Sequence, residues 1–245
     1  MFKGMEESMS GKTMNKELLV LQQEWLSVCD ADGMAGKYSL SRPFSFAVTE
    51  QYMRSKRRIM IIGQEAKDFS CYESDWPLPN IQQFNECYVN TQLNRRVPGY
   101  EYNRSPFWRF FREMAKEGIE PVWNNLDKFH QDINGKTIPL SLEMEYVFSK
   151  TYGKDNKSLL QREIELTKPT LVLFVTGPSY HESMALALNA DDRKLQEVKP
   201  TVSSPCRQIT ELTNMGIPMF WSYHPAYLSR RWSIQWVIDS IRNEF

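Results

Sequence analysis

Short apolar runs alternate along the chain with segments whose apolar residues recur at helical spacing. Four runs have the length and β-branched content of buried strands, at residues 59–62, 119–126, 170–176 and 217–223. Helices are expected at residues 16–29, 105–118, 159–167, 179–189 and 231–245. Strands that alternate with helices are typical of a parallel sheet with helices on both faces. The pattern predicts an α/β fold, a single domain with a central four-stranded, mainly parallel sheet flanked by helices.

Several stretches have no clear period and receive no element. They are residues 30–50, 64–104, 130–157 and 190–216, and the second is unusually long for a loop in a compact domain. Residues 1–14 are rich in Met, Gly and Ser and have little to bury. We therefore expect a flexible leader there and one domain over residues 15–245.

Composition excludes a protein coated in positive charge, because 30 basic and 30 acidic residues give a formal net charge of +0. A local basic groove, which nucleic-acid binding requires, is compatible with that balance. No signal peptide and no apolar run of about 18 residues is visible, so we expect a cytoplasmic protein without a membrane partner. The cysteines, Cys29, Cys71, Cys87 and Cys206, form no C-x-x-C pair, and we expect reduced thiols and no metal.

Two polar loops follow predicted strands and carry the residue types of a catalytic site. Gly63-Gln64-Glu65 follows the first strand, and His224-Pro225 follows the last one. Loops at the carboxyl ends of strands are where α/β sheets place their chemistry. A carboxylate in one loop and an imidazole in the other indicate an enzyme.

The order of these loops resembles the uracil-DNA glycosylase superfamily over roughly residues 55–245. The family's first motif is a strand followed by Gly-Gln-Asp-Pro-Tyr or a relative, and here residues 63–67 read Gly-Gln-Glu-Ala-Lys. Its second landmark is a strand that ends in an asparagine, as in Trp123-Asn124-Asn125. Its third is a strand, His-Pro-Ser and an intercalating loop, which residues 224–229 (His-Pro-Ala-Tyr-Leu-Ser) match closely. Residues 103–109 are similar to a helix of the family's mismatch-specific branch.

This resemblance implies a monofunctional DNA N-glycosylase that flips a pyrimidine out of DNA and hydrolyses its N-glycosidic bond. DNA is then the partner, and we expect a monomer without a cofactor. Glu65 would stabilise the sugar cation and orient or deprotonate water, and Asp68 is near enough in sequence to share or take that role. His224 would donate a hydrogen bond to O2 of the departing base.

The resemblance also implies which residues bind the base. Asn124 or Asn125 would read its edge, because an amide offers a donor and an acceptor together. Motif spacing favours Asn124 slightly and leaves Asn125 open. Backbone amides around Gln64 could bind an oxygen of the base. An aromatic residue of the following stretch could stack on it, with Phe69 and Tyr72 nearest to the motif and Trp76 and Phe84 further away.

Lys67 replaces an aromatic residue that excludes thymine in the uracil enzymes of the family. A pocket without that gate would admit a pyrimidine with a large 5-substituent. We therefore expect a modified cytosine or uracil as substrate, such as hydroxymethylated or glucosylated cytosine, in DNA repair or phage defence. A less favoured alternative is that Lys67 itself attacks C1′ as a Schiff-base nucleophile.

The His224 loop would also hold the DNA. Leu228 is the expected wedge that fills the gap left by the flipped base, with Tyr227 and Ser229 beside it. Arg230 and Arg231 could grip the flanking phosphates. The alternative for Leu228 is an ordinary buried leucine in a connection from strand to helix.

Two rival interpretations stay open. The first is a catalytically silent DNA- or nucleotide-binding member of the same fold, motivated by Glu65 and Ala66 where the family has Asp and Pro. The second is an unrelated α/β hydrolase or nucleotide-binding protein. No Walker loop, Gly-x-Ser-x-Gly or Gly-x-Gly-x-x-Gly motif supports the second.

Overall fold

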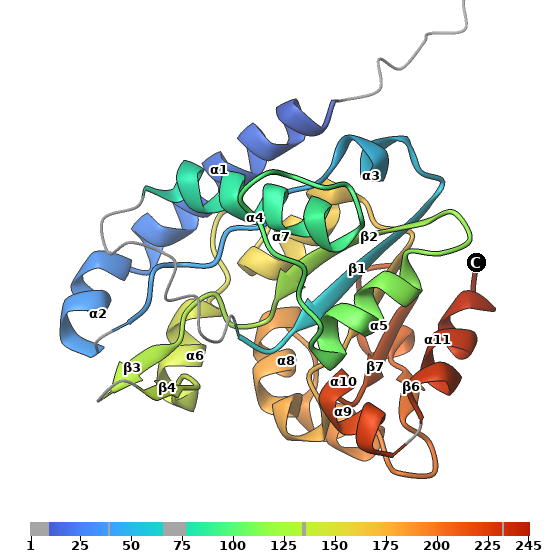
Figure 1. Cartoon of the computed structure of the whole chain (residues 1–245). Helices are drawn as coiled ribbons and strands as arrows, with labels where there is room; N and C mark the ends of the chain where they lie inside the picture. The colour runs from blue at the N-terminus through green and yellow to red at the C-terminus, as the bar shows by residue number, and fades with distance from the viewer. Residues whose placement is uncertain (1–9, 39, 66–76, 134–135, 232) are drawn as a thin grey trace, which may run out of the picture.

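A five-stranded mixed sheet forms the centre of the computed structural model, with helices packed around it (Figure 1). The structure describes residues 10–38, 40–65, 77–133, 136–231 and 233–245. The strand order is β2-β1-β5-β7-β6. The strands are β1 (Arg57–Gly63), β2 (Ile119–Asn125), β5 (Leu171–Phe174), β6 (Cys206–Gln208) and β7 (Met219–Ser222).

The four strands expected from the apolar runs are the four parallel ones. β1 pairs with β2 and β5, and β5 pairs with β7, all in parallel. Nearly all of their residues are buried, which explains why they appear in the sequence as continuous apolar runs. β6 is an additional edge strand that pairs antiparallel with β7. Its three residues are too short and too polar to give a strand signal, so the sequence prediction of four strands was one short.

Helices cover both faces of the sheet. On one face α7 (Leu159–Thr167) packs against α1 (Gly11–Val28). On the other, α5 (Pro106–Met114) packs against β2, α10 (Pro225–Arg230) and α11 (Ile234–Arg242), and these three helices lie together in Figure 1. Adjacent residues of β2 contact opposite sides, because Asn124 bonds to Glu163 of α7 whereas the Trp123 ring contacts Phe107 of α5.

The stretches without a clear period hold short elements. They are α2 (Ala31–Tyr38), α3 (Glu50–Arg54), α4 (Leu78–Gln92), the hairpin β3 (Gln131–Ile133) and β4 (Lys136–Ile138), α6 (Leu142–Phe148), α9 (Asp192–Glu197) and the 3₁₀ turn η2 (Thr210–Leu212). The 3₁₀ turn η1 (Pro178–Tyr180) leads from β5 into α8 (His181–Leu188). A second apolar cluster forms where Trp25 of α1 packs on Phe129 and Phe148.

The expected leader is too long at its C-terminal end. Ser10 caps α1 by accepting a hydrogen bond from the Thr13 backbone, and Met14 is buried in the core. Residues 1–9 lie outside the described part of the chain. Among the described helices, none combines the length and the apolar content that crossing a bilayer would require.

Candidate functional site

Three loop segments meet at the carboxyl edge of the parallel strands. Gly63 lies opposite Asn125 in the register of β1 and β2, and Leu126 N donates to Gly63 O at 3.0 Å. Asp127 N donates to Gln64 O at 3.0 Å, and the Gln64 side chain reaches the other way, its Nε2 donating to Thr176 O at 2.6 Å. The segment that carries Glu65 is thereby fixed to the ends of both neighbouring strands.

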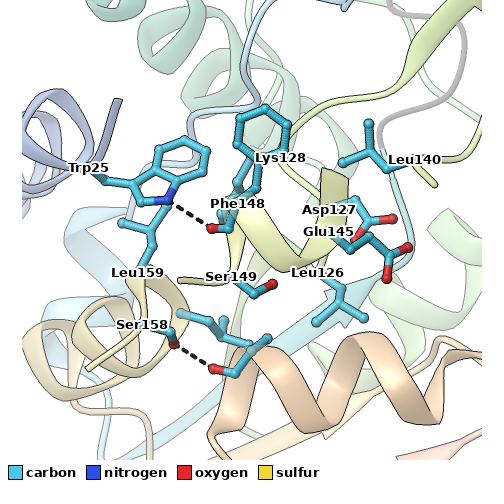
Figure 2. Close-up of a pocket in the computed structure, with 12 residues that line it drawn as sticks. Trp25, Leu126, Asp127, Lys128, Leu140, Glu145, Phe148, Ser149, Ser158 and Leu159 are labelled. Carbon is cyan, nitrogen blue, oxygen red and sulfur yellow. Dashed lines mark hydrogen bonds between the residues drawn. The ribbon is translucent and has the colours of Figure 1, made fainter. Parts of the chain in front are cut away.

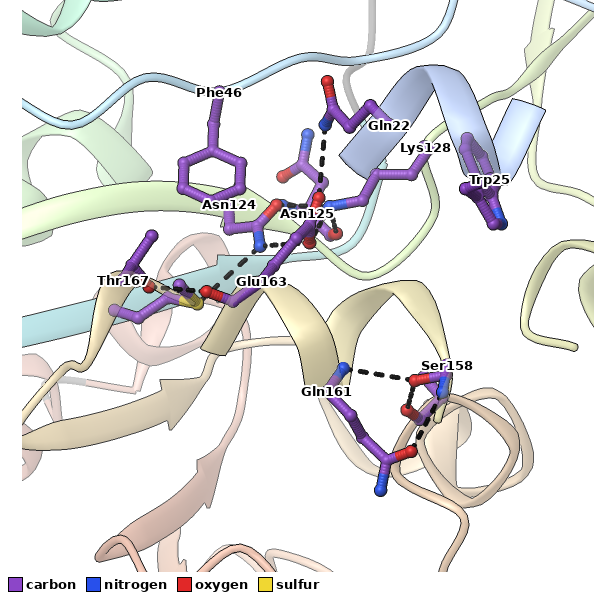
Figure 3. Close-up of polar contacts among 12 residues, drawn as sticks. Gln22, Trp25, Phe46, Asn124, Asn125, Lys128, Ser158, Gln161, Glu163 and Thr167 are labelled. Atoms are coloured by element: carbon purple, nitrogen blue, oxygen red, sulfur yellow. Dashed lines mark hydrogen bonds and ion pairs between the residues drawn. The ribbon is translucent and has the colours of Figure 1, made fainter. Parts of the chain in front are cut away.

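Asn124 belongs to a buried polar network on the α7 side of the sheet (Figure 3). Its Nδ2 donates to Glu163 Oε2 at 2.9 Å, and its Oδ1 accepts from Lys128 Nζ at 2.5 Å. Lys128 and Glu163 form a buried ion pair at 2.8 Å, and Gln22 of α1 donates to the same carboxylate. Both ends of the Asn124 amide are therefore used inside the protein. The slight preference for Asn124 as the base reader stays a prediction, and these internal contacts favour Asn125 in its place.

Asn125 lies on the opposite face, beside α5. Its Oδ1 accepts a hydrogen bond from Trp123 Nε1 at 3.0 Å. Its Nδ2 is buried and has no hydrogen-bond partner within the part of the chain that the structure describes. A Cβ on Gly63 would lie 2.7 Å from Asn125 Oδ1, so glycine leaves room for this amide. Since a buried unpaired donor costs about 1–3 kcal/mol, Nδ2 is a natural place for a ligand acceptor.

Glu65 lies among acidic and phenolic groups at the same edge. Its side chain is buried, and Tyr180 Oη donates to its Oε2 at 2.9 Å. Asp127 and Glu145 are its acidic neighbours, and Figure 2 shows their two carboxyl groups close together. These two residues also line a cavity of about 20 Å³. That volume holds one water-sized molecule and no nucleobase, so this cavity is not a base-binding pocket.

Burial is the main cause of the raised pKa values of Asp127, Glu145 and Tyr180. Burial raises the pKa of the Asp127 carboxyl well above 3.8, and the charges of Glu145 and Glu65 act in the same direction. Burial also raises the pKa of Glu145, with Glu182 and Glu65 adding to it and a hydrogen bond from Ser183 opposing it. The pKa of Tyr180 is raised by burial and by the Glu65 carboxylate, so its phenol keeps its proton and stays a donor.

His224 is the N-cap of α10, and only Tyr223 separates it from β7. Its Nδ1 accepts a hydrogen bond from Ala226 N at 3.2 Å. Because Nδ1 acts as the acceptor, the neutral imidazole carries its proton on Nε2. The Phe107 ring of α5 stacks on His224 with the ring centroids 6.2 Å apart. A Cβ on Gly63 would lie 3.6 Å from Phe107, so this ring connects the His224 loop to the Gly63–Asn125 contact.

The position of Leu228 agrees with the alternative of an ordinary buried leucine rather than with an exposed wedge. This side chain has 0% exposure and packs in the main core, because residues 225–230 form α10 and direct it inward. Tyr227 is half-buried and stacks on Tyr223 with the ring centroids 4.4 Å apart. Arg231 lies over the Tyr227 ring, and both Arg230 and Arg231 are exposed. The aromatic and cationic groups that this segment presents toward solvent are thus Tyr227 and the two arginines. Ser229 Oγ donates to Ala226 O within the helix.

Several predicted site residues lie outside the described residues. Lys67, Asp68 and Phe69 are among them, as are Ala66, Cys71, Tyr72 and Trp76. Phe84 is described and packs with Tyr88 and Tyr100 on α4 and its following loop. The described cysteines, Cys29, Cys87 and Cys206, are free thiols. In the described ranges, potential metal ligands gather only at His181, Glu182 and Asp192, which lie on α8 and α9.

Sequence reasoning missed Tyr180, Asp127 and Phe107. Tyr180 follows Gly177-Pro178 at the end of β5, where the carboxyl-edge rule could have found it. Asp127 lies two residues after β2, and its carboxylate gave no signal of burial. Phe107 belongs to the aromatic helix that was noted as a resemblance without a role.

Comparison of the chain with protein-family models and with curated proteins finds no match. The function of this protein is therefore inferred from its site residues.

Proposed function

We propose that this protein is a DNA glycosylase with a uracil-DNA glycosylase-like fold, which flips a 5-substituted pyrimidine out of DNA and hydrolyses its N-glycosidic bond. The observation that carries the proposal is that Glu65, Asn125 and His224 follow or end strands β1, β2 and β7 at the same edge of the sheet, and that the Phe107 ring stacks on His224 and lies beside Gly63. The resemblance of the three loop sequences to that superfamily supports it. A carboxylate, an amide and an imidazole are the groups that this hydrolysis needs.

His224 would act on the leaving base. As the bond from C1′ to the base nitrogen breaks, its electron pair moves to the base, and negative charge appears on O2. The Nε2–H of His224 is the donor for that charge, since its Nδ1 is held by the Ala226 amide. The capped helix fixes the ring, so the donor needs no reorganisation during the reaction.

Glu65 would act on the sugar and the water. Its carboxylate stabilises the positive charge that develops at C1′ and orients a water molecule toward that carbon. The water oxygen bonds to C1′, its proton passes to Glu65, and the base leaves as the anion and is protonated from solvent. Buried carboxylate charge is most effective where water is excluded, and the Glu65 side chain is 7% exposed.

Asn125 would read the base with its unpaired Nδ2, which needs an acceptor on the substrate. Trp123 holds the amide in one orientation, because its indole N–H donates to Asn125 Oδ1. Lys67, in place of the aromatic gate of uracil enzymes, is the sequence feature that favours a 5-substituted base. Tyr227 would enter the space left by the flipped nucleotide, with Arg230 and Arg231 at the phosphates.

The decisive experiment incubates the purified protein with DNAs that contain uracil, 5-hydroxymethylcytosine or glucosylated 5-hydroxymethylcytosine, and detects released bases by mass spectrometry. We expect release of a 5-substituted base. Glu65→Gln and His224→Gln should each lower the single-turnover rate about 100-fold or more. Glu143→Gln and His181→Gln, which change the same residue types away from the site, serve as matched controls and should leave it unchanged.

Two outcomes would contradict the proposal in different ways. If uracil is excised as well as, or better than, the 5-substituted cytosines, the substrate class is wrong. If no DNA releases a base although the protein binds DNA, the catalytically silent alternative holds.

A further inference from the structure

Tyr180 contacts Glu65 from a segment that is distant in sequence. It is the last residue of η1, after β5, and its phenol donates to Glu65 Oε2 at 2.9 Å. Tyr180 is partly buried against the main core. A phenol that reaches a buried carboxylate from a neighbouring strand end fixes the carboxylate's rotation, because one of its two oxygens is held.

The turn that presents Tyr180 is itself firmly bonded. Gly177 has a φ of 84°, which side chains rarely adopt, and its N donates to Ser222 O at 3.0 Å. Trp221 Nε1 donates to Thr176 Oγ1 at 3.1 Å and lies 3.2 Å from Gly177 O. The turn is thus held against the end of β7, two residues before His224. Tyr180 therefore connects the Glu65 segment to the strand that positions the imidazole.

The charges around Glu65 make this contact important. Asp127, after β2, and Glu145, on α6, are acidic groups that face it, and Lys128 and Glu182 modulate these two in turn. The phenol of Tyr180 donates to the Glu65 carboxylate and fixes the orientation of that carboxylate among these acidic groups.

We propose that Tyr180 is a positioning residue for Glu65, which holds the carboxylate in the orientation needed for attack of water on the sugar. This inference rests on the proposed glycosylase function. Tyr180 touches no substrate atom in this role and acts through Glu65. Its removal should slow the chemical step and leave DNA binding intact.

The test compares Tyr180→Phe, which deletes only the hydroxyl, with the wild type and with Tyr146→Phe, the same change on an exposed tyrosine of α6. Tyr180→Phe should lower the single-turnover rate about 10- to 100-fold, the range for one hydrogen bond to a charged group. The DNA dissociation constant should stay within about twofold. The acidic limb of the pH–rate profile should move to higher pH, because the carboxylate loses a donor that favours its charged form.

A second measurement does not depend on activity. In protein labelled with ¹³C at glutamate carboxyls, the signal lost in Glu65→Gln identifies Glu65, and its titration midpoint should rise in Tyr180→Phe. If rate, pH profile and midpoint all match the wild type, Tyr180 has no positioning role. If the wild type releases no base from any DNA, the glycosylase function fails, and the carboxyl titration still decides whether Tyr180 controls Glu65.

Discussion

At Gly63 the chain has no room for a side chain, because Asn125 Oδ1 occupies the position where a Cβ would come into contact, at 2.7 Å. Such a distance is shorter than van der Waals contact, and the obstacle is a side chain fixed by the Trp123 indole. Because glycine has only a hydrogen atom in place of a side chain, the Asn125 amide can lie against β1. Sequence alone indicated the glycine as part of a motif, whereas its reason lies in the neighbouring strand.

Gly63→Ala should therefore displace Asn125. We expect the free energy of unfolding to fall by about 1–3 kcal/mol, as in other overpacked cores, and base release to fall with it. Combining it with Asn125→Ala should restore most of the stability without restoring base release. Chemical denaturation and a double-mutant cycle measure this, and additive losses of stability would contradict the steric explanation.

Asp127 gives a pH-dependent prediction. Its pKa is raised by burial in the folded protein, so the folded state binds more protons than the unfolded state above pH 3.8. Its contribution to stability is therefore full at low pH and is lost as pH rises toward the folded pKa. Asparagine mimics the protonated form, so Asp127→Asn should gain stability relative to wild type as pH rises from about 4 to 8.

Thermal unfolding at several pH values measures this gain. Asp239→Asn, at an exposed position of α11, is the matched control and should show no such trend. A difference between Asp127→Asn and wild type that stays constant with pH would refute a buried, proton-binding Asp127.

Among the elements, α10 shows why a motif can be placed correctly and still be misread. The His-Pro sequence was expected to open a loop, but Pro225 suits the first turn of a helix and His224 caps it. Helical spacing then sends Leu228 inward and leaves Tyr227 and the arginines outside. The sequence predicted that this segment follows the last parallel strand, but its side-chain directions depend on a helix of six residues that leaves little periodic signal.

The directions of these side chains predict different roles for two neighbouring residues of α10, Leu228 in stability and Tyr227 in DNA binding. Leu228→Ala should lower the free energy of unfolding by about 2–5 kcal/mol, because it empties a site in the core. Tyr227→Ala should change stability little and weaken DNA binding about 10-fold, as expected when a stacking ring is lost. Denaturation and fluorescence anisotropy with labelled DNA make the comparison. A stable Leu228→Ala variant with impaired DNA binding would restore leucine as the wedge.

Over the whole molecule, parallel strand order brings together loops that are far apart in sequence. The four apolar runs were sufficient to predict this layer and the edge at which the candidate site residues lie. They could not predict β6, the β3–β4 hairpin or α6, whose short, half-exposed segments bury too little to leave a pattern. Nor could they show which of Asn124 and Asn125 faces α5, since the phase of a strand depends on what packs on each side.

The buried pair Lys128–Glu163 connects three elements. Lys128 bonds to Asn124 of β2, Glu163 lies on α7, and Gln22 of α1 donates to Glu163. Removing this pair therefore measures how much these contacts stabilise the fold. Lys128→Met should lower the free energy of unfolding by about 3–5 kcal/mol, because it leaves Glu163 buried without its cation. Lys128→Met with Glu163→Leu should recover much of that loss. The control is Lys157→Met, in an exposed pair with Glu165, where we expect about 0–1 kcal/mol.

Urea denaturation provides these values. Equal small losses for the buried and the exposed lysine would contradict a structural role for the interior pair. A double variant less stable than Lys128→Met alone would show instead that the polar network, rather than its charge balance, holds the three elements together.

The contact between Gly63 and Asn125 also constrains how this chain can diverge. A residue larger than glycine at the first position is compatible only with a smaller or reoriented side chain at the second, so the two should change together in descendants. A pattern that requires glycine before Gln-Glu at one strand end and asparagine at the neighbouring strand end would therefore detect distant relatives that overall identity misses. It would also separate lineages that kept the amide from those that remodelled the pocket.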